Sequence, residues 1–195
     1  MARGFTIRTT GIDELLKKLD KAPEKMRQLV DGVFENTAKE FVARAKRDAP
    51  KDTGFLTGEI SYRRDGNMKF NIFSGSRYAG YLEFGTKRNF RPIPGYEKEA
   101  AELRELSTGT AEEAIENITK WVRRKGIRFE SANKYKSGKK KGQNRLLTIE
   151  QTAWIIWHFI NINGIKPQPY FFKQVAIAEK NIDRDLKDIG EQIFD

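Results

Sequence analysis

The sequence contains no cysteine and only one histidine, His158, among its 195 residues. Without cysteine the chain can form neither a disulfide nor a zinc–sulfur site, and it has no thiolate nucleophile. A single histidine also excludes a multi-histidine metal site within one chain. Because no nucleophile or orienting acid lies near His158 in the sequence, we interpret it as a helix residue and not as a catalytic base. We therefore expect no catalytic residues, no cofactor, no bound metal and no enzymatic activity.

Long apolar runs are also missing. No stretch approaches the roughly 18 apolar residues that span a bilayer, and residues 1–5 lack the apolar segment of a secretory signal. Apolar residues make up 38% of the chain and charged residues 33%, which favours a modest core beneath a highly solvated surface. We expect a globular protein with no membrane partner.

Positive charge, by contrast, is concentrated in one segment. The chain has a net charge of +10, and residues 123–145 account for +9 of it, since Glu130 is the only acid there. The basic residues of this segment are Arg123, Arg124, Lys125, Arg128, Lys134, Lys136, Lys139, Lys140, Lys141 and Arg145. Such a segment attracts phosphates or an acidic protein surface. The alternative interpretation is a solvated, mobile loop, because blocks of like charge are commonly disordered.

Hydrophobic periodicity predicts an α+β core built from both ends of the chain. Residues 5–9 alternate as in a short strand, and residues 12–19 have helical spacing. A long helix is predicted over residues 24–48, directly after Pro23, and a second over residues 170–194. We expect these two helices to pack together against one face of a small antiparallel sheet.

The sheet is expected to contain a β-hairpin. Residues 60–64 and 68–73 alternate in polarity on either side of Asp65-Gly66, a pair that tolerates the positive φ of a tight turn. Met68, Phe70 and Ile72 should share one face of the second strand. The aromatic segment that follows, residues 78–84, is compatible with either a strand or a short helix.

A helical hairpin is predicted as an insertion into this core. Two capping boxes begin its helices, namely Thr110 with Glu113 and Thr148 with Gln151. These helices should end at Gly126 and at Asn163-Gly164. We therefore divide the chain into a core, residues 1–95 and 165–195, and a helical insertion, residues 96–164, with the basic loop at 123–145.

Three tryptophans, Trp121, Trp154 and Trp157, accompany the basic segment in this insertion. Aromatic rings beside cations can stack on nucleic-acid bases. The alternative is that the tryptophans form the seam between the two helices. We prefer the seam, because all three fit the apolar stripes of their helices.

Three short motifs together resemble a known family. They are Ala-Pro-Lys-Asp-Thr-Gly-Phe-Leu at 49–56, Tyr-Ala-Gly-Tyr-Leu-Glu-Phe-Gly-Thr at 78–86 and Gln-Pro-Tyr-Phe at 168–171. They follow a long helix, follow a hairpin and precede a C-terminal helix, respectively. In this order they are similar to the tail-completion, or head–tail joining, proteins of long-tailed bacteriophages, which are neck proteins. The chain departs from that family at residues 57–60, and the 81 residues between the second and third motifs exceed the spacing in compact members.

The resemblance implies a non-enzymatic virion protein that forms a ring, commonly sixfold, at the head–tail junction. Its partners would be copies of itself, the tail tube or tail terminator protein, and the head connector or head-completion protein. It would lie in the neck of the virion after assembly in the host cytoplasm. The resemblance does not extend to the basic segment; in such a ring it could face DNA in the channel. The alternative function, drawn from the residues alone, is a nucleic-acid-binding protein acting through residues 123–145.

The first two motifs supply the candidate interface. Its residues are Asp52, Thr53, Gly54, Tyr78, Tyr81, Glu83, Phe84, Gly85 and Thr86. Asp52-Thr53-Gly54 predicts a tight turn, and aromatic side chains are frequent at interface centres. The alternative is that these residues only pack the sheet against the helices. We prefer that alternative for Phe84, whereas both interpretations stay open for Tyr78, Tyr81 and Glu83.

Overall fold

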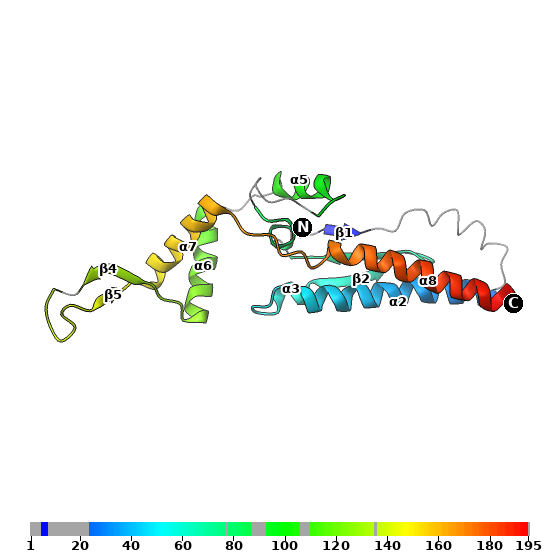
Figure 1. Cartoon of the computed structure of the whole chain (residues 1–195), viewed down its shortest axis with the longest axis horizontal. Coiled ribbons are helices and arrows are strands. Elements are labelled where there is room, and N and C mark those ends of the chain that lie inside the picture. Colours follow the sequence, from blue (N-terminus) through cyan, green and yellow to red (C-terminus); the bar gives the residue numbers. More distant parts are fainter. Residues whose placement is uncertain are drawn as a thin grey trace. The chain divides into compact units, whose positions relative to one another are not determined.

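The computed structural model describes residues 5–7, 24–76, 78–86, 93–105, 110–134 and 136–194. The chain divides into two compact units (Figure 1), the first formed by Met1–Arg104 with Lys166–Asp195 and the second by Glu105–Ile165. The helix predicted over residues 12–19 lies outside the described residues. The division into a core, residues 1–95 and 165–195, and an insertion, residues 96–164, stays a prediction.

The first unit contains the predicted antiparallel sheet. Its strands are β1 (Phe5–Ile7), β2 (Ile60–Arg64) and β3 (Phe70–Ser74), in the order β1-β3-β2. Ile60 pairs with Ser74 and Tyr62 with Ile72, so the side chains of Ile60, Phe70 and Ile72 share one face, and all three are buried. This face forms the sheet side of the core.

A long helix, α2 (Glu24–Asp48), covers that face and has the predicted bounds. Its buried side chains recur at spacings of three and four residues, including Val30, Phe34, Phe41 and Ala45. This stripe packs on β2 and β3, and α8 (Val175–Phe194) lies along α2 (Figure 1). The fold of this unit is therefore α+β, as predicted.

The C-terminal helix starts later than predicted. Residues 170 and 171 are not helical, a short 3₁₀ turn, η1 (Phe172–Gln174), follows them, and α8 begins at Val175. The remaining helices of this unit are short: α3 (Phe55–Gly58), α4 (Ala79–Phe84) and α5 (Glu97–Glu105). The aromatic segment at 78–84 is thus a helix and not a strand.

The turn of the hairpin is longer than predicted. The Asp65 N–H donates to the Lys69 carbonyl (2.7 Å), so the loop covers residues 65–69 and β3 begins at Phe70 instead of Met68. Met68 has a φ of 55°, and its N–H donates to the Asp31 carboxylate of α2 (2.9 Å). Its side chain is still buried. The Met68 N–H is therefore bonded to Asp31 and not to the neighbouring strand, as the prediction would have required.

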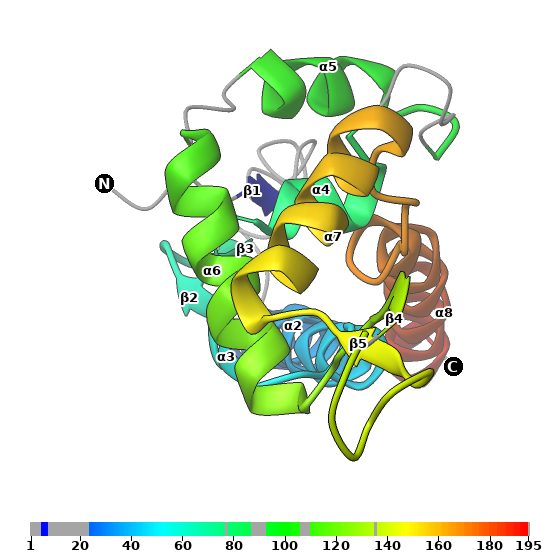
Figure 2. The same cartoon turned by 90° about the vertical axis from the view of Figure 1, so that its left-hand side faces the viewer.

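The second unit is a pair of helices joined by a β-ribbon. α6 (Ala111–Lys125) and α7 (Ile149–Asn163) lie side by side (Figure 2). Thr110 caps α6 by accepting the Glu113 N–H (3.2 Å), and Thr148 with Gln151 forms a complete capping box at α7. Between the helices, β4 (Glu130–Lys134) and β5 (Asn144–Leu146) pair antiparallel. Part of the predicted basic loop is therefore a two-stranded ribbon.

The seam of this hairpin differs from the prediction at Trp154. Trp121 and Trp157 are half-buried, but Trp154 is 51% exposed and stacks on His158 with ring centroids 5.1 Å apart. The fully buried residues of α7 are instead Thr152 and Ala153. The seam is therefore formed at this point by the small side chains of Thr152 and Ala153 and not by Trp154.

Candidate functional site

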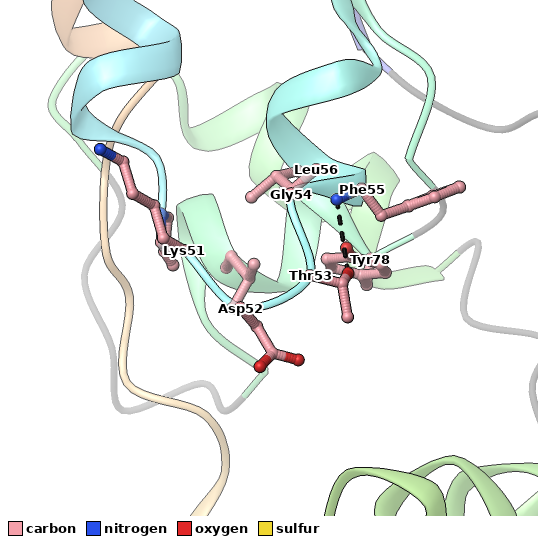
Figure 3. Close-up of a pocket in the computed structure, with 9 residues that line it drawn as sticks. Lys51, Asp52, Thr53, Gly54, Phe55, Leu56 and Tyr78 are labelled. Carbon is pink, nitrogen blue, oxygen red and sulfur yellow. Dashed lines mark hydrogen bonds between the residues drawn. The ribbon is translucent and has the colours of Figure 1, made fainter. Parts of the chain in front are cut away.

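The first motif forms the turn between α2 and α3. Gly54 has a φ of 83°, and its carbonyl accepts the Thr57 hydroxyl (2.8 Å) and the Gly58 N–H (2.9 Å). The Thr53 hydroxyl oxygen accepts the Phe55 N–H (3.4 Å) (Figure 3). A Cβ atom at position 54 would meet nothing closer than 3.9 Å. Glycine is therefore needed here for its left-handed backbone and not for lack of space.

This turn and the start of α4 line a small open pocket (Figure 3), formed by Pro50, Lys51, Asp52, Thr53, Gly54, Phe55, Leu56, Tyr78 and Leu82. Its volume is about 230 Å³, below the roughly 300–1,000 Å³ of typical small-molecule sites. Two aromatic rings stand at its edge, Phe55 (55% exposed) and Tyr78 (39% exposed), with centroids 6.3 Å apart. Exposed aromatic rings around a shallow hollow favour a protein contact over a ligand site.

Glu83 is wholly buried and acts as an anchor for the third motif. Its Oε2 accepts the N–H groups of Tyr170 (2.8 Å) and Phe171 (3.0 Å), and its Oε1 accepts the N–H of Phe172 (2.9 Å). One side chain thereby satisfies three consecutive backbone donors that would otherwise be costly to bury. The second and third motifs, 81 residues apart in the sequence, meet at this carboxylate.

The surroundings of Glu83 are aromatic. The Phe84 ring lies 5.2 Å from that of Phe172, and the Phe41 ring of α2 lies 5.0 Å from that of Phe171. Burial raises the pKa of Glu83, while its three N–H donors act in the opposite direction. Burial likewise raises the pKa of Tyr170. Since both carboxylate oxygens accept backbone N–H groups and the side chain has no exposed surface, Glu83 holds the C-terminal segment against α4 from within.

Gly85 ends α4 in a conformation that other residues avoid. Its φ of 71° and ψ of 175° fall in a region that is essentially restricted to glycine. Its N–H donates to the Tyr81 carbonyl (2.9 Å), and three residues before it the Leu82 carbonyl accepts the Gln168 N–H (2.6 Å). The Glu-Phe-Gly sequence therefore combines a buried anchor, a core ring and a backbone turn.

The nine residues of the predicted interface differ in exposure. Asp52, Thr53, Gly54 and Tyr78 are exposed, Tyr81 and Thr86 are half-buried, and Glu83, Phe84 and Gly85 are buried. Phe55 was not predicted as a member of this set, although an aromatic residue directly after a turn glycine is a local signal of an exposed contact. No local pattern indicates that Glu83 pairs with the third motif. The ten predicted basic residues are all exposed and lie in the second unit.

Over the described part of the chain, no group of three or more His, Asp and Glu side chains is placed to hold a metal ion. None of the helices described here combines the length and the apolar character needed to cross a bilayer.

Comparison with known families gives a match in the first unit. Residues 13–85 match the HK97-gp10-like family model, described as "Bacteriophage HK97-gp10, putative tail-component". No curated protein and no solved structure matches the chain. The matched region includes the first motif and all of the second except Thr86, and the hydrogen bonds of Glu83 join the third motif to it. Residues 13–85 are thus similar to a putative phage tail component, which confirms the family resemblance that the motifs indicated.

Proposed function

We propose that this protein is a structural subunit of the phage neck, where copies of it form a ring that joins the tail tube to the head connector. The family match supports a structural component of a phage tail. The observation that carries the finer proposal is the exposed aromatic pair, Phe55 and Tyr78, beside the pocket of the matched region. Exposed aromatics of this kind are enriched at interfaces and form their energetic centres.

The proposed contact between copies uses the exposed residues of the first two motifs. Asp52, Thr53 and Tyr78 are exposed around the pocket, and the Asp52 carboxylate is directed outward from the turn (Figure 3). A ring of more than two copies is built from head-to-tail contacts between neighbouring subunits. In such a contact this patch on one subunit meets a different patch on the next. Glu83, Phe84 and Gly85 support the patch from beneath by fixing the end of α4.

The two faces of such a ring would meet different partners. We assign one face to the tail tube or tail terminator protein and the other to the head connector or head-completion protein, with six copies as the expected ring number. The subunit would assemble in the host cytoplasm and remain in the neck of the virion. The core, residues 1–95 and 165–195, would build the ring, and the insertion, residues 96–164, would extend from it.

Size-exclusion chromatography with light scattering over a concentration series tests this proposal. We expect a closed oligomer for the unaltered chain, and a shift to monomer for Phe55→Ser and Tyr78→Ser. Phe159→Ser is the matched control, because Phe159 is an aromatic residue on α7 that is more exposed (62%) than Phe55 or Tyr78. A chain that stays monomeric at every concentration, and that binds no tail-tube protein, would contradict the proposal.

A further inference from the structure

We propose that the second unit binds the phosphate backbone of duplex DNA through the ribbon β4–β5 and the lysine-rich turn at its tip. This function is separate from ring formation and rests on other residues. It concerns the segment between Arg123 and Arg145, which carries +9 of the net charge of +10.

Three of the ten basic residues of this segment lie in a helix. Arg123, Arg124 and Lys125 form the last turn of α6, where cations are favoured by the helix dipole. Arg123 also approaches Glu150 of α7, at 4.0 Å. The other seven basic residues, from Arg128 to Arg145, follow the end of α6. All seven are exposed, and the only acid among them, Glu130, accepts a hydrogen bond from the Asn144 amide (2.8 Å).

The tip of the ribbon presents three of these lysines together. The Lys141 N–H donates to the Gly138 carbonyl (3.0 Å), and the Gln143 N–H donates to the Lys140 carbonyl (3.0 Å), which makes two successive turns. Gly138 and Gly142 have φ values of 81° and 85° and allow the chain to reverse there. Residues 136–146 are all exposed, so packing does not explain this arrangement. Lys139, Lys140 and Lys141 are adjacent like charges, and an anion lying against this turn would reduce the repulsion between them.

The chemistry of the tip favours DNA over an acidic protein. Lysine is depleted at the centres of protein–protein interfaces, which need apolar side chains that exclude water. Protein–DNA interfaces are far more positively charged, and residues 136–143 contain no large apolar side chain. The ribbon extends from the α6–α7 hairpin (Figure 1), and a two-stranded ribbon is narrow enough to enter the major groove of B-DNA. We assign it to the phosphate backbone, without base specificity.

Fluorescence anisotropy with the full chain and a labelled duplex of about 30 base pairs tests the proposal, over about 50–200 mM salt. We expect binding that weakens steeply with salt. Replacing the tip lysines together (K139Q/K140Q/K141Q) should weaken binding at least about tenfold and reduce the slope of log K against log salt by about 2–3, because each neutralised phosphate contributes about 0.9. The matched control, K25Q/K98Q/K180Q, removes the same charge from exposed lysines of the first unit and should change binding less than about twofold by that reasoning.

Three results would overturn the proposal. One is the absence of DNA binding at the lowest salt concentration. Another is an equal loss of affinity in the two triple variants, which would indicate net charge and not a site. The third is displacement of the duplex by poly-L-glutamate as effectively as by unlabelled DNA, which would assign the tip to an acidic protein. Repeating the titration with Phe55→Ser separates this outcome from that of the ring, since that variant changes the other unit.

Discussion

Glu83 shows how a single buried side chain can connect distant parts of a sequence. Its two carboxylate oxygens accept N–H groups from three consecutive residues, 170–172. An unsatisfied buried donor costs about 1–3 kcal/mol, so this carboxylate stabilises the C-terminal segment more than an exposed acid would. At the same scale, Gly85 supplies a backbone conformation that a side chain would strain.

Replacing Glu83 by glutamine should destabilise the protein by about 2–4 kcal/mol, because the new amide group would donate where backbone N–H groups already donate. Urea denaturation followed by circular dichroism measures the free energy of unfolding. Glu102→Gln, at an exposed position of α5, is the control and should change it by less than about 0.5 kcal/mol. Equal stability of the two variants would show that the carboxylate is not the anchor.

Gly85→Ala should also lower stability, by about 1–3 kcal/mol, since alanine avoids the observed backbone conformation. The comparison is Gly32→Ala within α2, where a new Cβ atom would meet nothing within 4 Å. That variant should gain about 0.5–1 kcal/mol, because alanine favours a helix over glycine. Thermal denaturation of both variants checks the opposite signs, and destabilisation of both would contradict the explanation from backbone conformation.

At the scale of elements, α2 is joined to the start of the C-terminal helix by Asp48. Its Oδ2 accepts hydrogen bonds from Gln174 Nε2 (3.0 Å) and Lys173 Nζ (2.9 Å), and its Oδ1 accepts one from Arg47 Nε (2.9 Å). These donors, Arg47 first and then Lys173, hold the pKa of Asp48 well below its usual value. A depressed pKa means that the ionised form stabilises the folded state.

This contact should depend on pH in a defined direction. The stabilisation by Asp48 is complete above the unfolded pKa of about 3.9 and is lost as the pH falls towards the lower folded pKa. Asp48→Asn should therefore lose about 1 kcal/mol or less at pH 7, a modest value for a partly exposed ion pair. The difference from the unaltered chain should shrink below about pH 4. Urea denaturation at several pH values measures it, with Asp183→Asn on the exposed face of α8 as the control.

A deficit of Asp48→Asn that is as large in strong acid as at neutral pH would show that packing, and not ionisation, causes it. The stabilising contact between α2 and η1 would then be the packing of the Gln174 side chain. That side chain is buried and also donates to the Tyr170 carbonyl (3.1 Å).

At the scale of the whole molecule, the two parts of the chain that form the first unit are joined by hydrogen bonds between distant residues. The Leu82 carbonyl accepts the Gln168 N–H (2.6 Å), and Glu83 holds the residues that follow. These hydrogen bonds lie wholly within the first unit. Its core includes side chains from α2, the sheet, α4 and residues 170–172.

Replacing residues 106–164 by a flexible glycine–serine linker should leave the first unit folded, because none of its core side chains is removed. Cooperative thermal unfolding and the oligomeric state should be kept, while binding to duplex DNA should be lost. Circular dichroism, light scattering and anisotropy on the same sample measure the three properties. Loss of cooperative unfolding would show that the first unit needs residues 106–164 in order to fold.

Local interactions of the sequence were sufficient for several elements. The bounds of α2, the capping box at Thr148, the end of α6 at Gly126 and the pairing of residues 60–64 with the next strand were all predicted and are present. Each depends on residues a few positions apart, through helical periodicity, a capping hydrogen bond or a short loop. The motifs likewise indicated the family, because they are continuous stretches.

Only the tertiary structure decided which residues of those motifs are buried. The donors that hold Glu83 lie 87–89 residues away in the sequence, so no local pattern could reveal that it is an interior anchor. The same applies to Met68, whose backbone N–H donates to Asp31 of α2. It also applies to α7, in which Thr152 and Ala153 are buried and Trp154 is exposed. Burial depends on contacts between distant segments, and periodicity within one segment does not specify them.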